Sequence, residues 1–370
     1  MQNDNAMHRI WQVILTEVRQ LLVWNTPSRS WHIALIVSLC MGIPVFAGAY
    51  FGKQDFGILV GMGTLVILYL PKTSIAHRML TLVACSFGFS VCFTLGLCAS
   101  FDPYVSVAVM TLTVLLIDVI CRYYSLPPPA SFFFILMIAV GSTMPFNLAG
   151  IPMRVGLISI GGMLACLIAL IYSLAIANKP IKLSPVPPVD RDIFAILLES
   201  LVIASFVGGS FLLSRLLHLN NPYWVPVSCA AIMQGATFRL IWHKKVHRII
   251  GTALGMGLTS IIFSLPLNVW TYALAITVLQ FIVEMLIVRN YGVAVIFITP
   301  LTMLFAEGAS VRVPPDSLVL TRLFDIILGS LIGVAGGWVL HHPKILTYVA
   351  GKVKSKTQTT IQVKTDKDLE

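Results

Sequence analysis

The sequence predicts an all-α membrane protein with about twelve transmembrane helices. Of its 370 residues, 57% are hydrophobic and only 11% are charged, whereas about 25% of the residues of a soluble domain are charged. Apolar runs of about 20 residues, the length that crosses a bilayer as a helix, recur along the chain. The basic residues gather between alternate apolar runs. A soluble fold of this length would not bury so much apolar surface, so we expect lipid to surround most of the chain.

The twelve predicted spans form two sets of six. The first set, within a unit at 31–177, is 31–51, 57–70, 79–99, 103–121, 130–146 and 154–177. The second set, within a unit at 193–342, is 193–214, 222–238, 247–265, 268–288, 291–307 and 319–340. Residues 178–192 contain four prolines and predict a stiff linker. Residues 1–30 include an amphipathic pattern at 7–24, typical of a helix on the membrane surface, and 343–370 form a basic polar tail.

The distribution of positive charge predicts the orientation. With both termini, the linker and the tail in the cytoplasm, all but five of the 25 Lys and Arg residues lie on the inner side. The five exceptions are Lys53, Arg154, Arg215, Arg312 and Arg322. An excess of Lys and Arg in cytoplasmic loops is typical of membrane proteins. This excess accounts for the net charge of +10, so we expect membrane lipid, and no nucleic acid, as a partner.

The two sets of spans predict an internal repeat, because three arginines recur at a separation of 167 to 170 residues. The pairs are Arg78 and Arg248, which each follow a histidine; Arg122 and Arg289, which each follow an acid; and Arg154 and Arg322, which each precede a glycine by seven residues. Units with an even number of spans have the same orientation. A pseudo-twofold axis along the membrane normal should relate them, with a substrate pathway at their interface.

The second half also resembles a known family. The segments that carry the resemblance are Pro222-Tyr223-Trp224, Arg248-Ile-Ile-Gly251-Thr252-x-x-Gly255 and Arg322-Leu-Phe-Asp325-Ile-Ile-Leu-Gly329. They are similar to the signature of the fusaric acid resistance protein-like (FUSC) family of aromatic acid exporters. The first half keeps the arginines but has Gln54-Asp55-Phe56 in place of the Pro-Tyr-Trp corner, and Leu157 in place of Asp325.

The resemblance implies export of aromatic or other weak organic acids across the bacterial inner membrane. The energy source would be the proton gradient, and some members use a periplasmic adaptor subunit. The membrane part of plant aluminium-activated malate channels is similar, so a passive organic-anion channel is an alternative. A non-transporting scaffold subunit is a third interpretation. The internal duplication is compatible with a functional monomer, and a homodimer is the alternative.

A proton-coupled transporter needs a titratable acid at membrane depth, and ionisable groups within spans are functional candidates because they are costly to bury. Thr277, Gln280 and Glu284 are spaced three and four apart, so they share one helical face. This polar stripe should face protein or water. Glu284 is therefore a proton-coupling candidate; the alternative is a structural pair with Arg289 or Arg122.

The inner ends of the spans carry further candidates. Asp118 and Arg122 are four residues apart and can pair on their own helix. Arg122 and Arg289 together would form a positive ring suited to carboxylates, or would simply anchor the helices at the interface. Glu199 has no partner on its own helix. Glu199 is a second proton-coupling candidate, or a partner for a basic residue of the linker. Asp118 is a further proton-coupling candidate.

The outer ends carry another group. Arg322 and Asp325 lie within one turn, which favours a structural ion pair, and the resemblance makes them candidates for a gate or for the packing of the two halves. Arg322 is also a candidate for the anion pathway, and Asp325 is also a proton-coupling candidate. Arg154 lacks a matching acid and is available to an anion. Tyr223 and Trp224 are expected in the aromatic belt at the interface, or in contact with an aromatic substrate.

No motif predicts an enzyme, a cofactor or a metal. The sequence has no P-loop, HExxH or nucleophile elbow. The adjacent His341 and His342 have no accompanying acid or cysteine at ligand spacing. The seven cysteines lack CxxC spacing, which favours a packing role.

Overall fold

The structure is a computed structural model that describes residues 24, 30–176, 185, 188–189, 192–234, 238–307 and 315–342, without the side chains of 238–244, 306–307 and 315–320. The amphipathic helix predicted at 7–24, most of the predicted linker at 178–192 and the tail at 343–370 lie outside these residues. Every regular element in the described part is helical.

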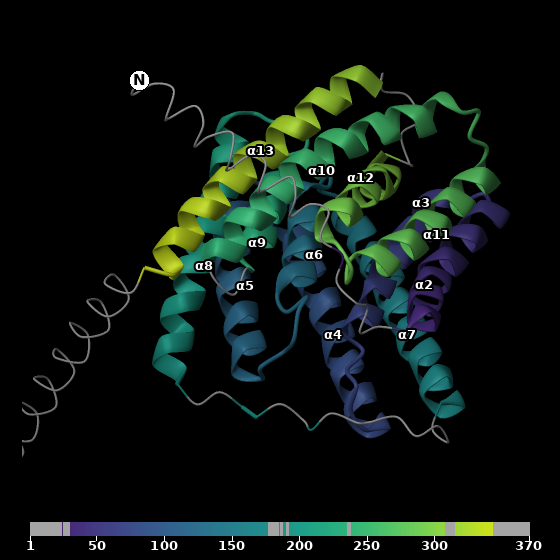
Figure 1. Ribbon diagram of the computed structural model, residues 1–370, viewed down its shortest axis with the longest axis horizontal. Helices are drawn as coiled ribbons and strands as arrows, with labels where there is room; N and C mark the ends of the chain where they lie inside the picture. The colour runs from purple at the N-terminus through teal and green to yellow at the C-terminus, as the bar shows by residue number, and fades with distance from the viewer. Residues whose placement is uncertain are drawn as a thin grey trace, which may run out of the picture.

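Each of the twelve predicted apolar segments forms a helix (Figure 1). In the first half these are α2 (Trp31–Tyr50), α3 (Gln54–Gly63) with its 3₁₀ continuation η1 (Thr64–Tyr69), α4 (Ile75–Ala99), α5 (Pro103–Tyr123), α6 (Phe132–Thr143) and α7 (Ile151–Ala175), the last preceded by a short 3₁₀ turn η2 (Leu148–Gly150). In the second half they are α8 (Ile193–Leu216), α9 (Trp224–Met233), α10 (Phe238–Ser264), α11 (Val269–Leu286), α12 (Tyr291–Glu307) and α13 (Pro315–Leu340).

Local sequence explains where the fourth helix of each half begins. The side chain of Asp102 accepts hydrogen bonds from the amides of Tyr104 and Val105, and Pro103 occupies the first turn of α5. Asn268 caps α11 in the same way, and the Thr271 hydroxyl accepts a hydrogen bond from the Asn268 amide. Capping of this kind satisfies amides that have no partner within the helix.

The predicted spans 222–238 and 247–265 leave a basic loop between them. This predicted loop is wrong. Residues 239–248 form the first part of α10. Arginine and lysine are good helix formers, so the segment continues the apolar helix instead of turning the chain. The preceding helix, α9, ends at Met233, and α10 begins at Phe238.

Helix length divides the twelve helices into two classes. Eight are long and apolar enough to cross a membrane, namely α2, α4, α5, α7, α8, α10, α11 and α13, which makes the chain a multi-pass membrane protein. The other four, α3 with η1, α6, α9 and α12, are shorter. An α-helix of ten residues rises about 15 Å, half of a hydrocarbon core of about 30 Å. The short helices occupy the second and fifth positions of each half.

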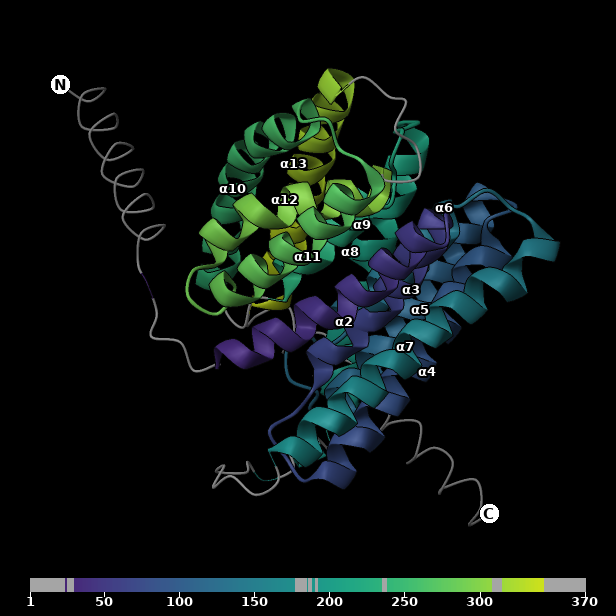
Figure 2. The same cartoon turned by 90° about the vertical axis from the view of Figure 1, so that its right-hand side faces the viewer.

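The two halves pack internally in corresponding ways. In the first half α4 packs against α6 and α7, and α3 packs against α7; in the second half α10 packs against α12 and α13, and α9 packs against α13. The halves meet along two main seams, α2 against α11 and α5 against α8 (Figures 1 and 2), and through a smaller contact of α6 with α9. Each seam therefore joins the first helix of one half to the fourth helix of the other.

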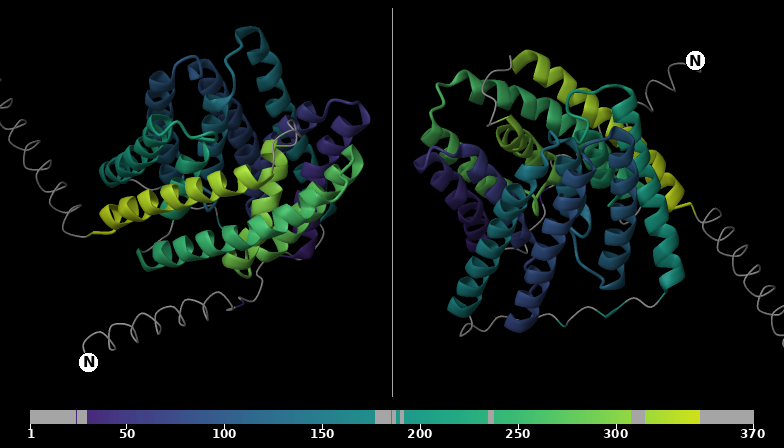
Figure 3. Two further views of the ribbon diagram at one scale, coloured as in Figure 1. Left: turned by 90° about the horizontal axis from the view of Figure 1, so that it is seen from above. Right: turned by 180° about the vertical axis from the view of Figure 1, so that it is seen from behind.

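The long helices of the two halves do not all run in one direction. In Figure 1 and in the right panel of Figure 3, α10 and α13 lie side by side and cross the direction of α4, α5, α7 and α8. Membrane helices tilt on average by about 20°. The arrangement thus departs from the near-parallel bundle that twelve equal spans would form.

Small residues allow close approach of helices both within a half and between the halves. A Cβ atom added at Gly161 of α7 would meet the carbonyl oxygen of Val60 and the Cα of Gly63. In the seams, Gly42 of α2 faces Thr277 of α11, and a Cβ there would meet the threonine hydroxyl. Gly208 of α8 faces Thr111 of α5 in the same manner. Close approach at small residues is the usual way in which helices associate in lipid.

The outward faces of the long helices are apolar. Leu80 and Phe87 of α4, Met163 and Ile171 of α7, and Leu254 of α10 are exposed. Exposed apolar patches of this extent are unusual on soluble proteins. Their position on the outside of the bundle agrees with contact to lipid chains.

Candidate anion site

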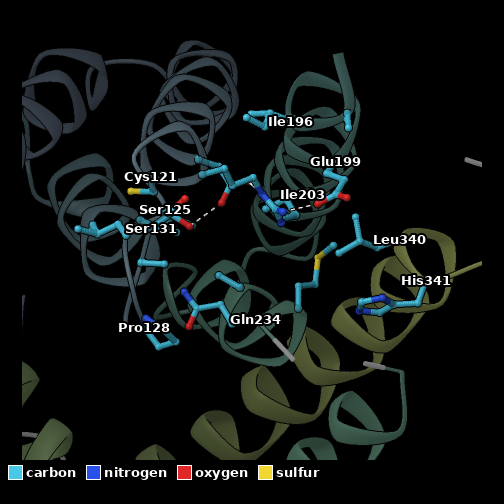
Figure 4. A pocket seen from close by; sticks show the side chains of 18 residues that line it. Cys121, Ser125, Pro128, Ser131, Ile196, Glu199, Ile203, Gln234, Leu340 and His341 are labelled. Atoms are coloured by element: carbon cyan, nitrogen blue, oxygen red, sulfur yellow. Dashed lines mark hydrogen bonds and ion pairs between the residues drawn. The ribbon is translucent and has the colours of Figure 1, made fainter. Parts of the chain in front are cut away.

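A cavity of about 680 Å³ lies on the α5–α8 seam (Figure 4). The start of α6, the end of α9 and the end of α13 complete its walls. Most lining residues are apolar, among them Ile135, Ile196, Ile203, Met233 and Leu340. The polar lining residues are Asp118, Arg122, Ser125, Ser131, Glu199, Gln234 and His341. Both halves of the chain thus contribute to one cavity.

The guanidinium of Arg122 bridges the two halves at the wall of this cavity. Its Nε donates a 2.7 Å hydrogen bond to Oδ2 of Asp118, four residues earlier on α5. Its Nη1 donates to Oε2 of Glu199 on α8. The pair expected from the spacing of Asp118 and Arg122 is therefore present. Glu199 also has a partner, which is Arg122; the basic residues of the linker lie outside the described residues.

The two carboxylates differ in their surroundings. Asp118 is 4% exposed and also accepts hydrogen bonds from the hydroxyls of Ser131, at 2.8 Å, and Ser200, at 2.9 Å. Glu199 has a side chain that is 36% exposed, and Arg122 supplies its one hydrogen bond within the residues that the structure describes. Asp118 is thus fixed by three donors, whereas Glu199 is held by one.

The rim of the cavity is tied together by side-chain contacts to backbone carbonyls. Nε2 of Gln234 donates a 3.0 Å hydrogen bond to the carbonyl of Pro129, which joins the end of α9 to the loop before α6. The hydroxyl of Ser125 donates to the carbonyl of Pro188 at 2.8 Å. Sequence reasoning missed Ser131, Ser200 and Gln234. The available signal was a serine beside Glu199 in an otherwise apolar run.

The second seam carries the polar stripe predicted on α11. Gln280 is 3% exposed and Glu284 is 5% exposed, and Nε2 of Gln280 lies 3.3 Å from Oε1 of Glu284. Thr277 contacts Gly42 of α2. Of the two surroundings predicted for this stripe, protein or water, Gln280 and Glu284 are buried in protein. The role of Glu284 in proton coupling stays a prediction.

Arg289 lies three residues beyond the end of α11, which is a helix of the second seam. It is partly buried, and its Nε has no hydrogen-bond partner among the described residues. Arg122 lies on α5, which packs against α8, whereas α11 packs against α2. The two arginines thus belong to different seams. A shared ring of positive charge gains no support from these contacts.

In the group predicted at the outer ends, Arg322 contacts two other helices. Its guanidinium carbon lies 3.1 Å from the ring centroid of Trp224, and Nη2 donates a 2.8 Å hydrogen bond to the Thr302 hydroxyl. Arg322 thus reaches α9 and α12, and Asp325 on the same helix is buried at 2% exposure. The ion pair between Arg322 and Asp325 stays a prediction.

The neighbouring aromatic residues also differ from a membrane belt. Trp224 is only 6% exposed, because Arg322 covers its ring and Tyr223 lies with its ring centroid 4.7 Å away. Tyr223 packs against the core. On the first half, Nη1 of Arg154 donates to the carbonyl of Pro145 at 3.0 Å. Their roles toward a substrate stay predictions.

Trp224→Leu is expected to destabilise the second half by about 3 kcal/mol, since it removes a large buried ring and the cation–π contact with Arg322. Trp224→Phe keeps an aromatic face and should therefore lose markedly less stability. Thermal unfolding of the purified protein in detergent measures both. Equal losses for the two variants would show that the ring face does not hold Arg322.

These features define a multi-pass α-helical membrane protein with an ion-paired cavity between its halves. Comparison with known proteins gives a consistent result. Residues 208–336 match the family model described as fusaric acid resistance protein-like, and this range contains all three segments that carry the resemblance. The uncharacterized membrane protein YvaC of Bacillus subtilis (strain 168) is 38% identical over 119 residues, which are 32% of this chain and 19% of that protein. The chain thus matches about a fifth of its relative's length. No solved structure matches significantly.

Proposed function

We propose that this protein transports organic carboxylates across the bacterial inner membrane and exports aromatic or other weak organic acids. The observation that carries the proposal is the Arg122 guanidinium at the wall of a cavity of about 680 Å³. Arginine recognises carboxylates through two parallel hydrogen bonds. The apolar remainder of the lining suits an aromatic ring or a hydrocarbon chain.

The position of the cavity favours capture from the cytoplasm. The predicted orientation places the end of α5, the start of α8 and the end of α13 on the inner side, because the basic residues gather there. Arg122, Glu199 and His341 belong to these helix ends. A carboxylate would enter from the cytoplasm and meet Arg122 first.

We also propose that the halves are two six-helix repeats with both termini in the cytoplasm. Three features support the repeat: short second and fifth helices in each half, corresponding helix contacts, and a glycine–threonine contact in each seam. Interrupted helices at corresponding positions of two repeats often border transport sites. Two of the four short helices, α6 and α9, line the cavity.

Arg122→Gln tests the proposal. In liposomes that contain the full chain, flux of an aromatic carboxylate is expected to fall by about tenfold to a hundredfold, because a charge-assisted hydrogen bond to the substrate is lost. Arg122→Lys keeps the charge but loses the planar fork, so its flux should be intermediate. Undiminished flux in folded Arg122→Gln protein would contradict a role for this site.

The same assay distinguishes the alternatives. A passive channel would give voltage-driven anion current that no proton gradient alters. A scaffold would give no flux with any organic anion. A coupled transporter should move anions in response to an imposed proton gradient.

A further inference from the structure

We infer that Glu199 is a proton-operated counter-ion of Arg122, so that one proton on Glu199 and one organic anion on Arg122 bind together. The inference rests on the proposed function of the cavity. It assigns unequal roles to the two acids that contact the same guanidinium. Asp118 is a positioning residue, and Glu199 is the group that a substrate carboxylate replaces.

The hydrogen bonds carry this division. Asp118 is buried and accepts from Ser131, Ser200 and Arg122. Its displacement would leave two buried hydroxyls without their acceptor, which is costly. Glu199 is partly exposed to the cavity, and Arg122 is its one hydrogen-bond donor among the described residues. A substrate carboxylate that replaces Glu199 would accept the same hydrogen bond from Nη1 of Arg122, so one carboxylate takes the place of another.

The charge balance sets the role of the proton. With Asp118, Arg122 and Glu199 ionised, the cluster carries a net charge of −1. An added anion would bring three negative charges to one guanidinium. If Glu199 first accepts a proton, its bond to Arg122 weakens, Nη1 becomes available, and the bound anion restores the net charge of −1. Each ligand then strengthens the binding of the other by the same factor.

Two other titratable groups line the cavity and must be separated from Glu199. Cys121 lies on α5, and His341 follows α13. The lining residues of α6 and α9 include Ser131 and Gln234 but no charged side chain. Protonation of a histidine would also raise the affinity for anions at low pH, since its protonated form attracts them.

The inferred sense of the linkage has a functional consequence. A weak acid that crosses the membrane in its neutral form dissociates inside the cell and releases one proton and one anion. Both products favour the anion-bound form of this site. Acidification of the cytoplasm would thus increase anion capture. In an exchanger with a single shared site, proton and anion compete for binding. In this arrangement they bind together.

Binding of benzenesulfonate to the purified full chain tests the inference. This probe stays ionised throughout the range from about pH 5 to about pH 8, so any pH dependence belongs to the protein. For the wild type, affinity is expected to rise toward low pH by up to about tenfold per pH unit, the limit for one linked proton. Glu199→Gln should bind with nearly constant affinity, and more tightly than the wild type near pH 8.

Three comparisons make the result decisive. Glu199→Asp keeps an acid and should keep the pH dependence, as should His341→Gln. If Glu199→Gln retains the wild-type dependence, or binds more weakly at every pH, the inference is wrong while the proposed function stands. If the wild type binds no organic anion at any pH, both are overturned.

Discussion

Gly161→Val is expected to destabilise the first half by about 3 kcal/mol or more and to reduce the yield of monodisperse protein in detergent. A Cβ at this position would overlap the carbonyl oxygen of Val60 and lie 2.9 Å from Cα of Gly63 and 3.0 Å from the amide nitrogen of Thr64. All three are backbone atoms, which cannot rotate away as a side chain can. The segment from α3 into η1 would have to shift away from α7, and overpacking of this kind usually costs about 1–3 kcal/mol or more.

Gly156→Val is the matched control. It lies on α7 as well, but a Cβ there meets nothing within 4 Å. Valine has a slightly better helix propensity than glycine, so this variant should be as stable as the wild type or slightly more stable. Thermal unfolding with the same detergent compares the two. Similar losses at both positions would show that the close approach to Gly63 does not limit the substitution.

The same reasoning applies to the second half. A Cβ at Gly329 of α13 would meet the carbonyl oxygen of Val225 and the Cβ of Ser228, 2.8 Å away. Gly161 and Gly329 are the glycines that follow Arg154 and Arg322 by seven residues in the sequence. The two glycines that mark corresponding positions of the predicted repeat thus both lie where the sixth helix of a half touches the second.

The sequence was sufficient for the location of the helices but not for their lengths. Apolar runs identified all twelve, because lipid requires apolar side chains over the whole span. The same runs could not reveal that α9 ends at Met233 and that α10 already begins at Phe238. An apolar residue is compatible with a helix or with a short connection packed against protein, and only tertiary contacts decide between them.

Distance along the chain explains which site contacts were predictable. Asp118 and Arg122 lie four apart, so helix geometry alone pairs them. Glu199 is 77 residues from Arg122, and no local rule joins α5 to α8. The pair of Arg322 and Asp325 was predicted because the two are close in sequence. The contacts of Arg322 with Trp224 and Thr302 join separate helices, and a single sequence cannot place these residues nearby.

Asp118→Ala is expected to be the most damaging substitution at the cavity, with a loss of about 3–5 kcal/mol in the free energy of unfolding. Removal of the buried partner of a charged pair costs about this much, and among the described residues Arg122 would keep only its contact with Glu199. The hydroxyls of Ser131 and Ser200 also lose their acceptor. Asp118→Asn keeps one carbonyl oxygen as an acceptor, so its free energy of unfolding should fall by less. Denaturant unfolding in detergent or thermal unfolding provides the measurement.

Glu199→Gln is the matched comparison, since it alters the other acid on the same guanidinium. Its side chain is 36% exposed, and exposed ion pairs contribute about 1 kcal/mol or less. We therefore expect a small stability loss together with a large change in the pH dependence of anion binding. Asp118→Ala should show the opposite order, with stability lost first and binding lost as a result. If the two substitutions destabilised the protein equally, Glu199 would be as much a part of the scaffold as Asp118, and it could not leave Arg122 to admit a substrate.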